Sequence, residues 1–204
     1  MKFRARLLNL VGGFSKSQAG VAAIEFAMTI PFLLFLFVGM VELITAISYD
    51  RRVSKTGSSI ADLVARSSDV TGKMDDIERA IAHQMTPYDD ADIDVRIGMV
   101  LIKANSPEIV WSWGNKVPVP WAKGSKPDGV SFSANMKSNG QYYLISTSSL
   151  DYNFILGKLL SNLSQVLTGE SDQFTSIALS DSFVLHPRKV SCVEYYNSCA
   201  NYPS

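Results

Sequence analysis

A single carboxylate stands inside a long apolar stretch near the start of this 204-residue chain, five residues after a glycine. The stretch begins Gly20-Val21-Ala-Ala-Ile-Glu25-Phe26, and no further charged residue occurs until Glu42. A charged side chain within a membrane-spanning helix costs about 2.5 to 3.5 kcal/mol, so it is rare unless it has a partner or a task. Glu25 is therefore the first candidate for a functional residue.

An acidic cluster in the middle of the chain is the best candidate for metal chemistry. It consists of Asp89, Asp90, Asp92 and Asp94. Carboxylate oxygens at such spacing suit calcium, but the EF-hand pattern fails, because Val95 stands at its glycine position and Leu101 at its bidentate glutamate position. We interpret the cluster as a solvated loop leading into a strand and expect no metal site.

The two histidines have no catalytic partner at motif level. His83 is expected on a helix surface, and His186 directly precedes Pro187 at the end of a strand. The sequence contains no GxSxG, no HExxH and no phosphate-binding glycine loop. We therefore expect no enzymatic activity and no cofactor. No basic cluster interleaved with aromatic residues follows the first twenty residues, which argues against a nucleic-acid partner.

Three tryptophans could form a binding platform or part of a core. Trp111 and Trp113 are two residues apart and would share one buried face of a strand, whereas Trp121 follows in a loop. Exposed aromatic side chains make effective binding surfaces, so a ligand surface formed by the three is the alternative interpretation.

The only two cysteines, Cys192 and Cys199, lie close together near the C-terminus. A disulfide between them suits an exported domain in an oxidising compartment. Free thiols are the alternative, and the absence of a second cysteine pair argues against a zinc site.

The elements that must position Glu25 begin with one transmembrane helix over residues 21–47, long enough for a hydrocarbon core of about 30 Å. Residues 1–20 form a basic leader with Lys2, Arg4, Arg6 and Lys16, which favours a cytoplasmic N-terminus, although Arg51, Arg52 and Lys55 weaken the bias. A secretory signal cleaved after Ser48 is disfavoured, because the apolar stretch is too long. A plain signal anchor, with Glu25 near the cytoplasmic interface, stays open.

Residues 48–204 are expected to form one extracytoplasmic α+β domain. The helix should continue to about Arg66, with a shorter helix over 73–85 that buries Met74, Ile77, Ile81 and Met85. Strands are predicted around 93–101, 109–113, 142–147 and 174–185, with a turn at 105–107 and a long surface loop over 116–140. A further helical stripe is predicted to face the core: Leu156, Leu159, Leu160, Leu163 and Leu167.

The N-terminal stretch resembles a type IV prepilin-type processing site, and more narrowly the TadE-like family, the minor pseudopilins of the Tad (tight adherence) pilus. Ala23, Glu25, Phe26, Ala27, Pro31 and Glu42 match the family's pattern. The resemblance implies cleavage between Gly20 and Val21, with Glu25 and Phe26 as recognition positions. It also implies that Glu25 helps the subunit enter a filament by meeting a neighbour's N-terminal amine, since opposite charges attract strongly in low dielectric.

The resemblance implies a pilin-like fold and a non-catalytic component or assembly factor of a Tad-type pilus. Its partners would be a prepilin peptidase, the inner-membrane assembly platform, other pilins or pseudopilins, and the lipid bilayer. The protein would be a single-pass protein of the bacterial inner membrane with a periplasmic domain, and incorporation into a surface pilus is a further expectation. The alternative is an anchored envelope domain that binds a ligand or partner without entering a filament.

Overall fold

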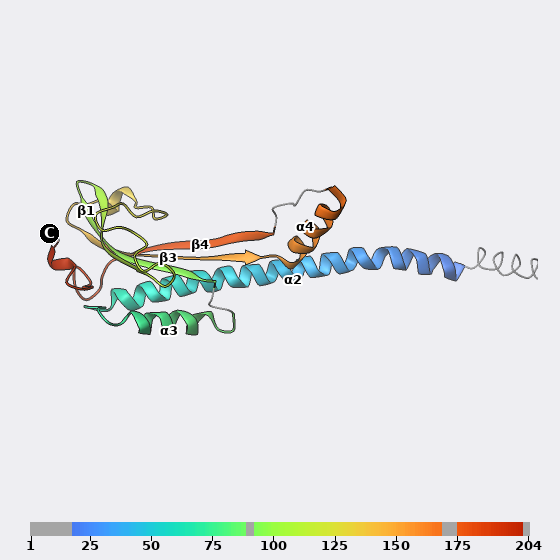
Figure 1. Cartoon of the computed structure of the whole chain (residues 1–204), viewed down its shortest axis with the longest axis horizontal. Coiled ribbons are helices and arrows are strands. Elements are labelled where there is room, and N and C mark those ends of the chain that lie inside the picture. The colour runs from blue at the N-terminus through green and yellow to red at the C-terminus, as the bar shows by residue number, and fades with distance from the viewer. Residues whose placement is uncertain (1–17, 89–91, 169–174, 202–204) are drawn as a thin grey trace, which may run out of the picture. The chain divides into compact units, whose positions relative to one another are not determined.

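The computed structural model describes residues 18–88, 92–168 and 175–201. The chain divides into two units, Met1–Ile44 and Thr45–Ser204, each of which is described by itself. Helix α2 (Gln18–Ala65) begins in the first unit and ends in the second (Figure 1). Its end at Ala65 agrees with the predicted continuation of the apolar helix to about Arg66.

In the first unit, α2 is apolar on every side. Exposed apolar side chains occur at most positions from Val21 to Ile44, so this part has no single buried face. A helix that is hydrophobic all round belongs in a membrane or in the interior of an assembly. Pro31 lies inside the helix, which a membrane helix tolerates better than a soluble one.

The second unit is built on a four-stranded antiparallel sheet with the order β2-β1-β3-β4. The strands are β1 (Asp94–Lys103), β2 (Ser106–Gly114), β3 (Tyr142–Asn153) and β4 (Ser176–Leu185). Together with the helices, this sheet confirms the predicted α+β, pilin-like fold (Figure 1).

The turn between β1 and β2 is tighter than the sequence suggested. Ala104 and Asn105 both have positive φ, and β2 already begins at Ser106. Pro107 pairs with Ile102 in the ladder instead of lying in the turn. This position is available to proline because β2 is an edge strand of the sheet.

One face of the sheet packs on α2 and α3 (Met74–Met85). The second half of α2 contributes Val53, Ile60 and Val64, all almost fully buried. Helix α3 buries the four predicted side chains and carries Asp75 and Asp76 in its first turn, where the helix dipole favours acidic groups.

The opposite face of the sheet is covered by the long loop between β2 and β3, which includes the short helix η1 (Ala134–Met136). Trp121 from this loop packs there with Val100, Ile109 and Tyr143. The predicted surface loop therefore also closes a second, smaller core.

Helix α4 (Ile155–Thr168) connects β3 to β4 and differs from the prediction. Leu159 is 60% exposed and Ile155 is 65% exposed. Neither core cluster includes a described side chain of α4. The prediction that the leucine stripe faces the core is wrong for Leu159. An amphipathic pattern shows that one face of a helix must be buried, but it does not identify what buries that face.

Candidate functional site

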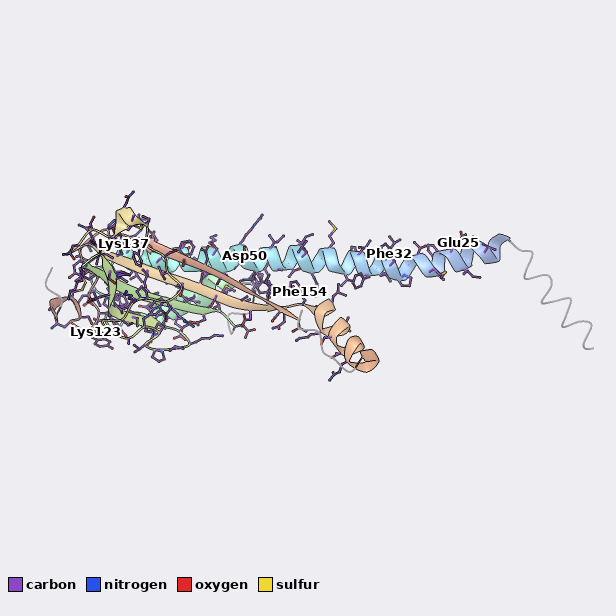
Figure 2. All side chains as sticks on the ribbon, turned by 90° about the horizontal axis from the view of Figure 1, so that it is seen from above. Glu25, Phe32, Asp50, Lys123, Lys137 and Phe154 are labelled. Carbon is purple, nitrogen blue, oxygen red and sulfur yellow. A yellow bond between two sulfur atoms is a disulfide. The ribbon has the colours of Figure 1, made fainter. Side chains whose placement is uncertain are left out.

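The residues implied in processing and assembly lie on the first turns of α2 (Figure 2). Val21 is 56% exposed and Phe26 is 66% exposed, while Gly20 is half-buried. At about 100° per residue, the neighbours Glu25 and Phe26 project from different sides of the helix. A partner that recognises both side chains must therefore contact more than one face of this segment.

The Glu25 side chain is exposed on α2. Among the described residues its carboxylate has no hydrogen bond or ion pair, and only its backbone carbonyl is engaged, by the Thr29 hydroxyl at 2.7 Å. The helix around it presents Val21, Ile24 and Met28. The carboxylate thus lies on an apolar surface, where a cationic group from another molecule would be the natural partner.

The other candidates for chemistry are not assembled into a site. Asp89 and Asp90 lie outside the described residues, and Asp94 forms an ion pair with Arg96 at 2.6 Å. Hydrogen bonding to Asp94 raises the pKa of the Arg96 guanidinium above its ordinary value. In the part of the chain that the structure describes, no group of three His, Cys, Asp or Glu side chains could hold a metal ion.

The histidines lie where the sequence suggested. His83 is exposed on α3, in its last turn. His186 follows β4 and packs against the Tyr143 ring, with 4.4 Å between ring centroids.

All three tryptophans belong to the cores, so the interpretation as an exposed ligand platform is wrong. Trp111 and Trp113 share the face of the sheet that packs on the helices, and Trp121 is buried on the opposite face. Their exposed fractions are 4%, 9% and 4%. Gly98 makes room for the Trp121 ring, because a Cβ at this position would lie 3.2 Å from it.

A polar hollow of about 360 Å³ lies beside β3 and β4. Its lining includes Arg96, Asp128, Thr147, Ser149, Ser180 and Ser182. With Asp181, which also lines it, the hollow has three charged side chains beside its hydroxyl groups, a lining suited to a polar ligand. The sequence did not identify the hollow, because its side chains come from three strands and a loop.

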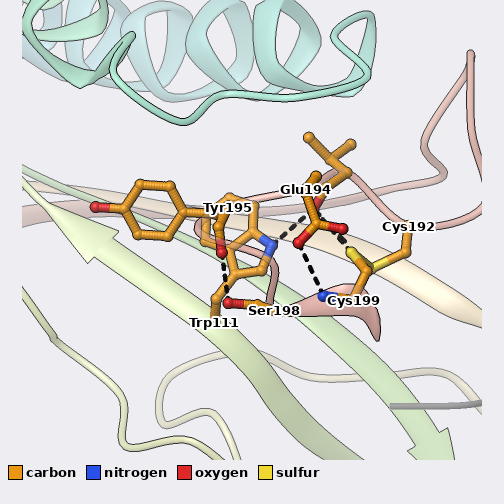
Figure 3. Close-up of a disulfide and its surroundings, with 7 residues drawn as sticks. Trp111, Cys192, Glu194, Tyr195, Ser198 and Cys199 are labelled. Atoms are coloured by element: carbon orange, nitrogen blue, oxygen red, sulfur yellow. Dashed lines mark hydrogen bonds between the residues drawn. A yellow bond between two sulfur atoms is a disulfide. The ribbon is translucent and has the colours of Figure 1, made fainter. Parts of the chain in front are cut away.

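Cys192 and Cys199 are joined by a disulfide in a C-terminal segment that packs on the sheet (Figure 3). The indole nitrogen of Trp111 donates a hydrogen bond to the Val193 carbonyl at 2.8 Å. The Cys199 amide donates to the Glu194 carboxylate at 3.1 Å, and Tyr195 packs against Trp111. Burial, followed by the effect of Tyr196, raises the pKa of Tyr195 above its ordinary value.

The same segment is tied to the end of α2. The Arg188 amide donates to the Ala65 carbonyl at 2.8 Å, and the Arg188 side chain pairs with Asp62 at 2.5 Å. Glu194 exchanges backbone hydrogen bonds with Ser68 and Val70. The sequence signalled the disulfide but gave no sign that this segment fastens the loop after α2.

Helix α2 approaches strand β3 most closely at Gly57. The Ser146 hydroxyl donates to the Gly57 carbonyl at 3.3 Å, and a Cβ on Gly57 would lie 2.5 Å from the Ser148 hydroxyl oxygen. Gly57 lies on the face of α2 that packs against the sheet. Only the position of β3 shows that residue 57 must be a glycine.

One helix within the described residues, Gly20–Ala65, is long and apolar enough to cross a membrane. A family model described as TadE-like protein matches residues 20–56, so the match begins at the glycine and includes Glu25 and Phe26. Comparisons with curated proteins and with solved structures gave no match. The apolar helix and the family match together favour anchoring in a membrane. Over residues 20–56 this chain is similar to TadE-like proteins.

Proposed function

We propose that the protein is a non-catalytic, pseudopilin-like component or assembly factor of a Tad-type pilus. The observation that carries the proposal is the position of Glu25, an exposed carboxylate without a described partner on a helix that is apolar on every side. A carboxylate inside a membrane has a high free-energy cost unless a group from another molecule pairs with it. The family match over residues 20–56 supports this interpretation.

The proposed topology places the N-terminus in the cytoplasm and residues 48–204 in the periplasm, with residues 21–47 across the inner membrane. The basic residues of the leader support this orientation. A prepilin peptidase would cut between Gly20 and Val21, next to the membrane surface. The product would begin at Val21, and its new amine would lie four residues before Glu25.

The proposed role of Glu25 follows from the electrostatics of an apolar environment. A carboxylate and an ammonium attract each other far more strongly in low dielectric than in water. The Glu25 carboxylate of one subunit and the Val21 amine of a neighbouring pilin or pseudopilin can therefore set the register between two helices. The inner-membrane assembly platform would be the partner that brings the subunits together.

The processing step is tested by mass spectrometry of the N-terminal peptide of the full chain, recovered from membranes with and without a prepilin peptidase. We expect Val21 as the first residue only when the peptidase is present. Gly20→Ala should block this cleavage, whereas Gly39→Ala, a matched change on the same helix, should leave it intact. An N-terminus at Met1 under all conditions would contradict the processing step, and one at Tyr49 would contradict the membrane assignment.

The assembly step is tested with Glu25→Ala and with Thr29→Ala as a control one turn further along the helix. We expect Glu25→Ala to abolish pilus-dependent adherence while the amount of membrane-bound protein stays the same. Thr29→Ala removes only a hydroxyl bonded to the helix backbone and should preserve adherence. Normal adherence with Glu25→Ala would favour the alternative, an anchored domain that binds a polar ligand in the hollow beside β3 and β4.

A further inference from the structure

Helix α4 carries an apolar face, and two of its described side chains, Ile155 and Leu159, are exposed. At 100° per residue, the seven apolar side chains of Ile155–Thr168 fall within one arc of about 140°, and the other seven residues fill the opposite side. Ile155 and Leu159, on one edge of the apolar arc, are 65% and 60% exposed. Lys158 is the only charged residue of the helix.

The position of α4 in the domain follows from the end of β3. Tyr152, near the end of this strand, packs against Tyr49 of α2, with 5.2 Å between ring centroids, and Phe154 packs against Tyr152. Helix α4 begins at the next residue. Ile177, which pairs with Tyr152 across β3 and β4, adds a third exposed apolar side chain at the same end of the sheet.

Tyr49 connects this end of the domain to the predicted membrane span. The span is expected to end at Ile47, and two residues of helix advance the chain by only about 3 Å. Chain continuity therefore places Tyr49 next to the point where α2 leaves the bilayer. Because Tyr49 contacts Tyr152, the start of α4 must also lie near that level.

The residues around this end have the composition of a membrane interface. Tyr49 packs against Tyr88 as well as Tyr152, so three tyrosines and Phe154 gather here. Tyrosine is enriched at the level of lipid headgroups, because its ring is apolar and its hydroxyl is polar. Arg51 and Lys55 are exposed on the next turns of α2. Basic side chains beside a membrane attract anionic lipid headgroups.

We infer that α4 lies in the surface of the bilayer as a second membrane contact, with Ile155 and Leu159 inserted among the lipids and its polar face toward water. Such interfacial helices have one apolar and one polar side, as α4 has. Together with α2, this contact would fix the rotation and tilt of the domain above the membrane. The inference depends on the proposed anchoring of residues 21–47 but not on cleavage or on filament entry.

The test uses the full chain reconstituted in phosphatidylcholine vesicles that contain brominated lipids, which quench tryptophan fluorescence by contact. Leu159→Trp reports on the apolar face of α4. Gln165→Trp, exposed on the polar side of the same helix, is the matched control. Lys137→Trp reports on the opposite end of the domain, as Figure 2 shows. The native tryptophans are buried in the domain and supply the background.

We expect Leu159→Trp to show a blue-shifted emission and a loss of fluorescence beyond that of the unchanged protein. Gln165→Trp should lose less, and Lys137→Trp should match the background. If the vesicle-bound chain floats and Leu159→Trp is not quenched, the inference is overturned while the anchoring stands. A blue shift that grows with protein density and is not accompanied by quenching would also overturn the inference. It would indicate that a second copy of the chain covers this face. A chain that does not float with the vesicles would refute both the anchoring and the inference.

Discussion

Replacement of Gly57 by alanine tests whether the domain depends on a close approach of α2 to the sheet. The added Cβ would lie 2.5 Å from the Ser148 hydroxyl oxygen, 3.0 Å from the Ser148 Cβ and 3.2 Å from the Phe183 ring. The Cβ of Ser148 is fixed to the backbone of β3, so rotation of its hydroxyl cannot relieve the whole conflict. Helix α2 must therefore move away from the strand.

The magnitude follows from two opposing effects. Overpacking of this kind costs about 1–3 kcal/mol. Alanine in place of glycine inside a helix stabilises the helix by up to about 1 kcal/mol. The outward movement also weakens the hydrogen bond from Ser146 to the Gly57 carbonyl, which contributes about 0.5–1.5 kcal/mol. We expect a net loss of about 1–2 kcal/mol, which lowers the Tm by about 2–8 °C in a protein of this size.

The assay is thermal unfolding of the full chain in detergent, followed by the fluorescence of the three buried tryptophans. Ser59→Ala, two residues further along α2, is the control that changes helix propensity at a half-buried position. Ser148→Ala should partly restore the Tm of Gly57→Ala, because it removes the 2.5 Å contact and leaves those at 3.0 and 3.2 Å. An increase in Tm for Gly57→Ala alone would show that helix propensity outweighs the contact, which would refute the reasoning.

Two further predictions concern the C-terminal segment. Cys192→Ser combined with Cys199→Ser should lower the free energy of unfolding by about 2–3 kcal/mol, measured by chemical denaturation with the reduced native protein as the control. A hydrogen bond from the Thr71 amide lowers the pKa of Asp69, and the Thr71 hydroxyl accepts from the Tyr196 amide. The lowered pKa contributes stability above pH about 4 that is lost as the pH falls through the folded-state value. Asp69→Asn should therefore speed hydrogen exchange at Tyr196 at pH 7 and change little at pH 2; equal effects at both would contradict this linkage.

The sequence predicted the helices and strands whose buried face is visible as a regular spacing of apolar residues within one segment. Helix α3 shows its buried face in the spacing of Met74, Ile77, Ile81 and Met85, and a reader of the sequence needs no partner to see it. The two tryptophans of β2 were placed on one face for the same reason. Pro107 was assigned to the turn because proline is common there, and only the edge position of β2 explains its place in the strand.

What the sequence could not predict depends on contacts between distant segments. A bulge between Met99 and Val100 turns both Val110 and Trp111 toward the helices. No pattern in the sequence of β2 predicts this bulge. The leucines of α4 carried a clear helical pattern, yet the pattern is the same whether a sheet, a second protein or a lipid surface covers it. The segment around Glu25 could be recognised from the sequence, because its glycine, glutamate and apolar residues are contiguous.

The two units of the chain give α2 two different surfaces, and this difference determines what each substitution should change. Up to Ile44 the helix is apolar all round and carries Glu25, so changes there should affect processing or assembly and leave the folding of the domain intact. After Thr45 the helix has one buried face, closed by Gly57 and Val64, so changes there should affect the Tm first. Glu25→Ala with an unchanged Tm, and Gly57→Ala with unchanged cleavage after Gly20, would together show that one continuous helix serves two independent roles. A Tm that falls with Glu25→Ala would instead mean that the apolar segment contributes to the fold of the domain, and Glu25 could then not be assigned to assembly from a loss of adherence alone.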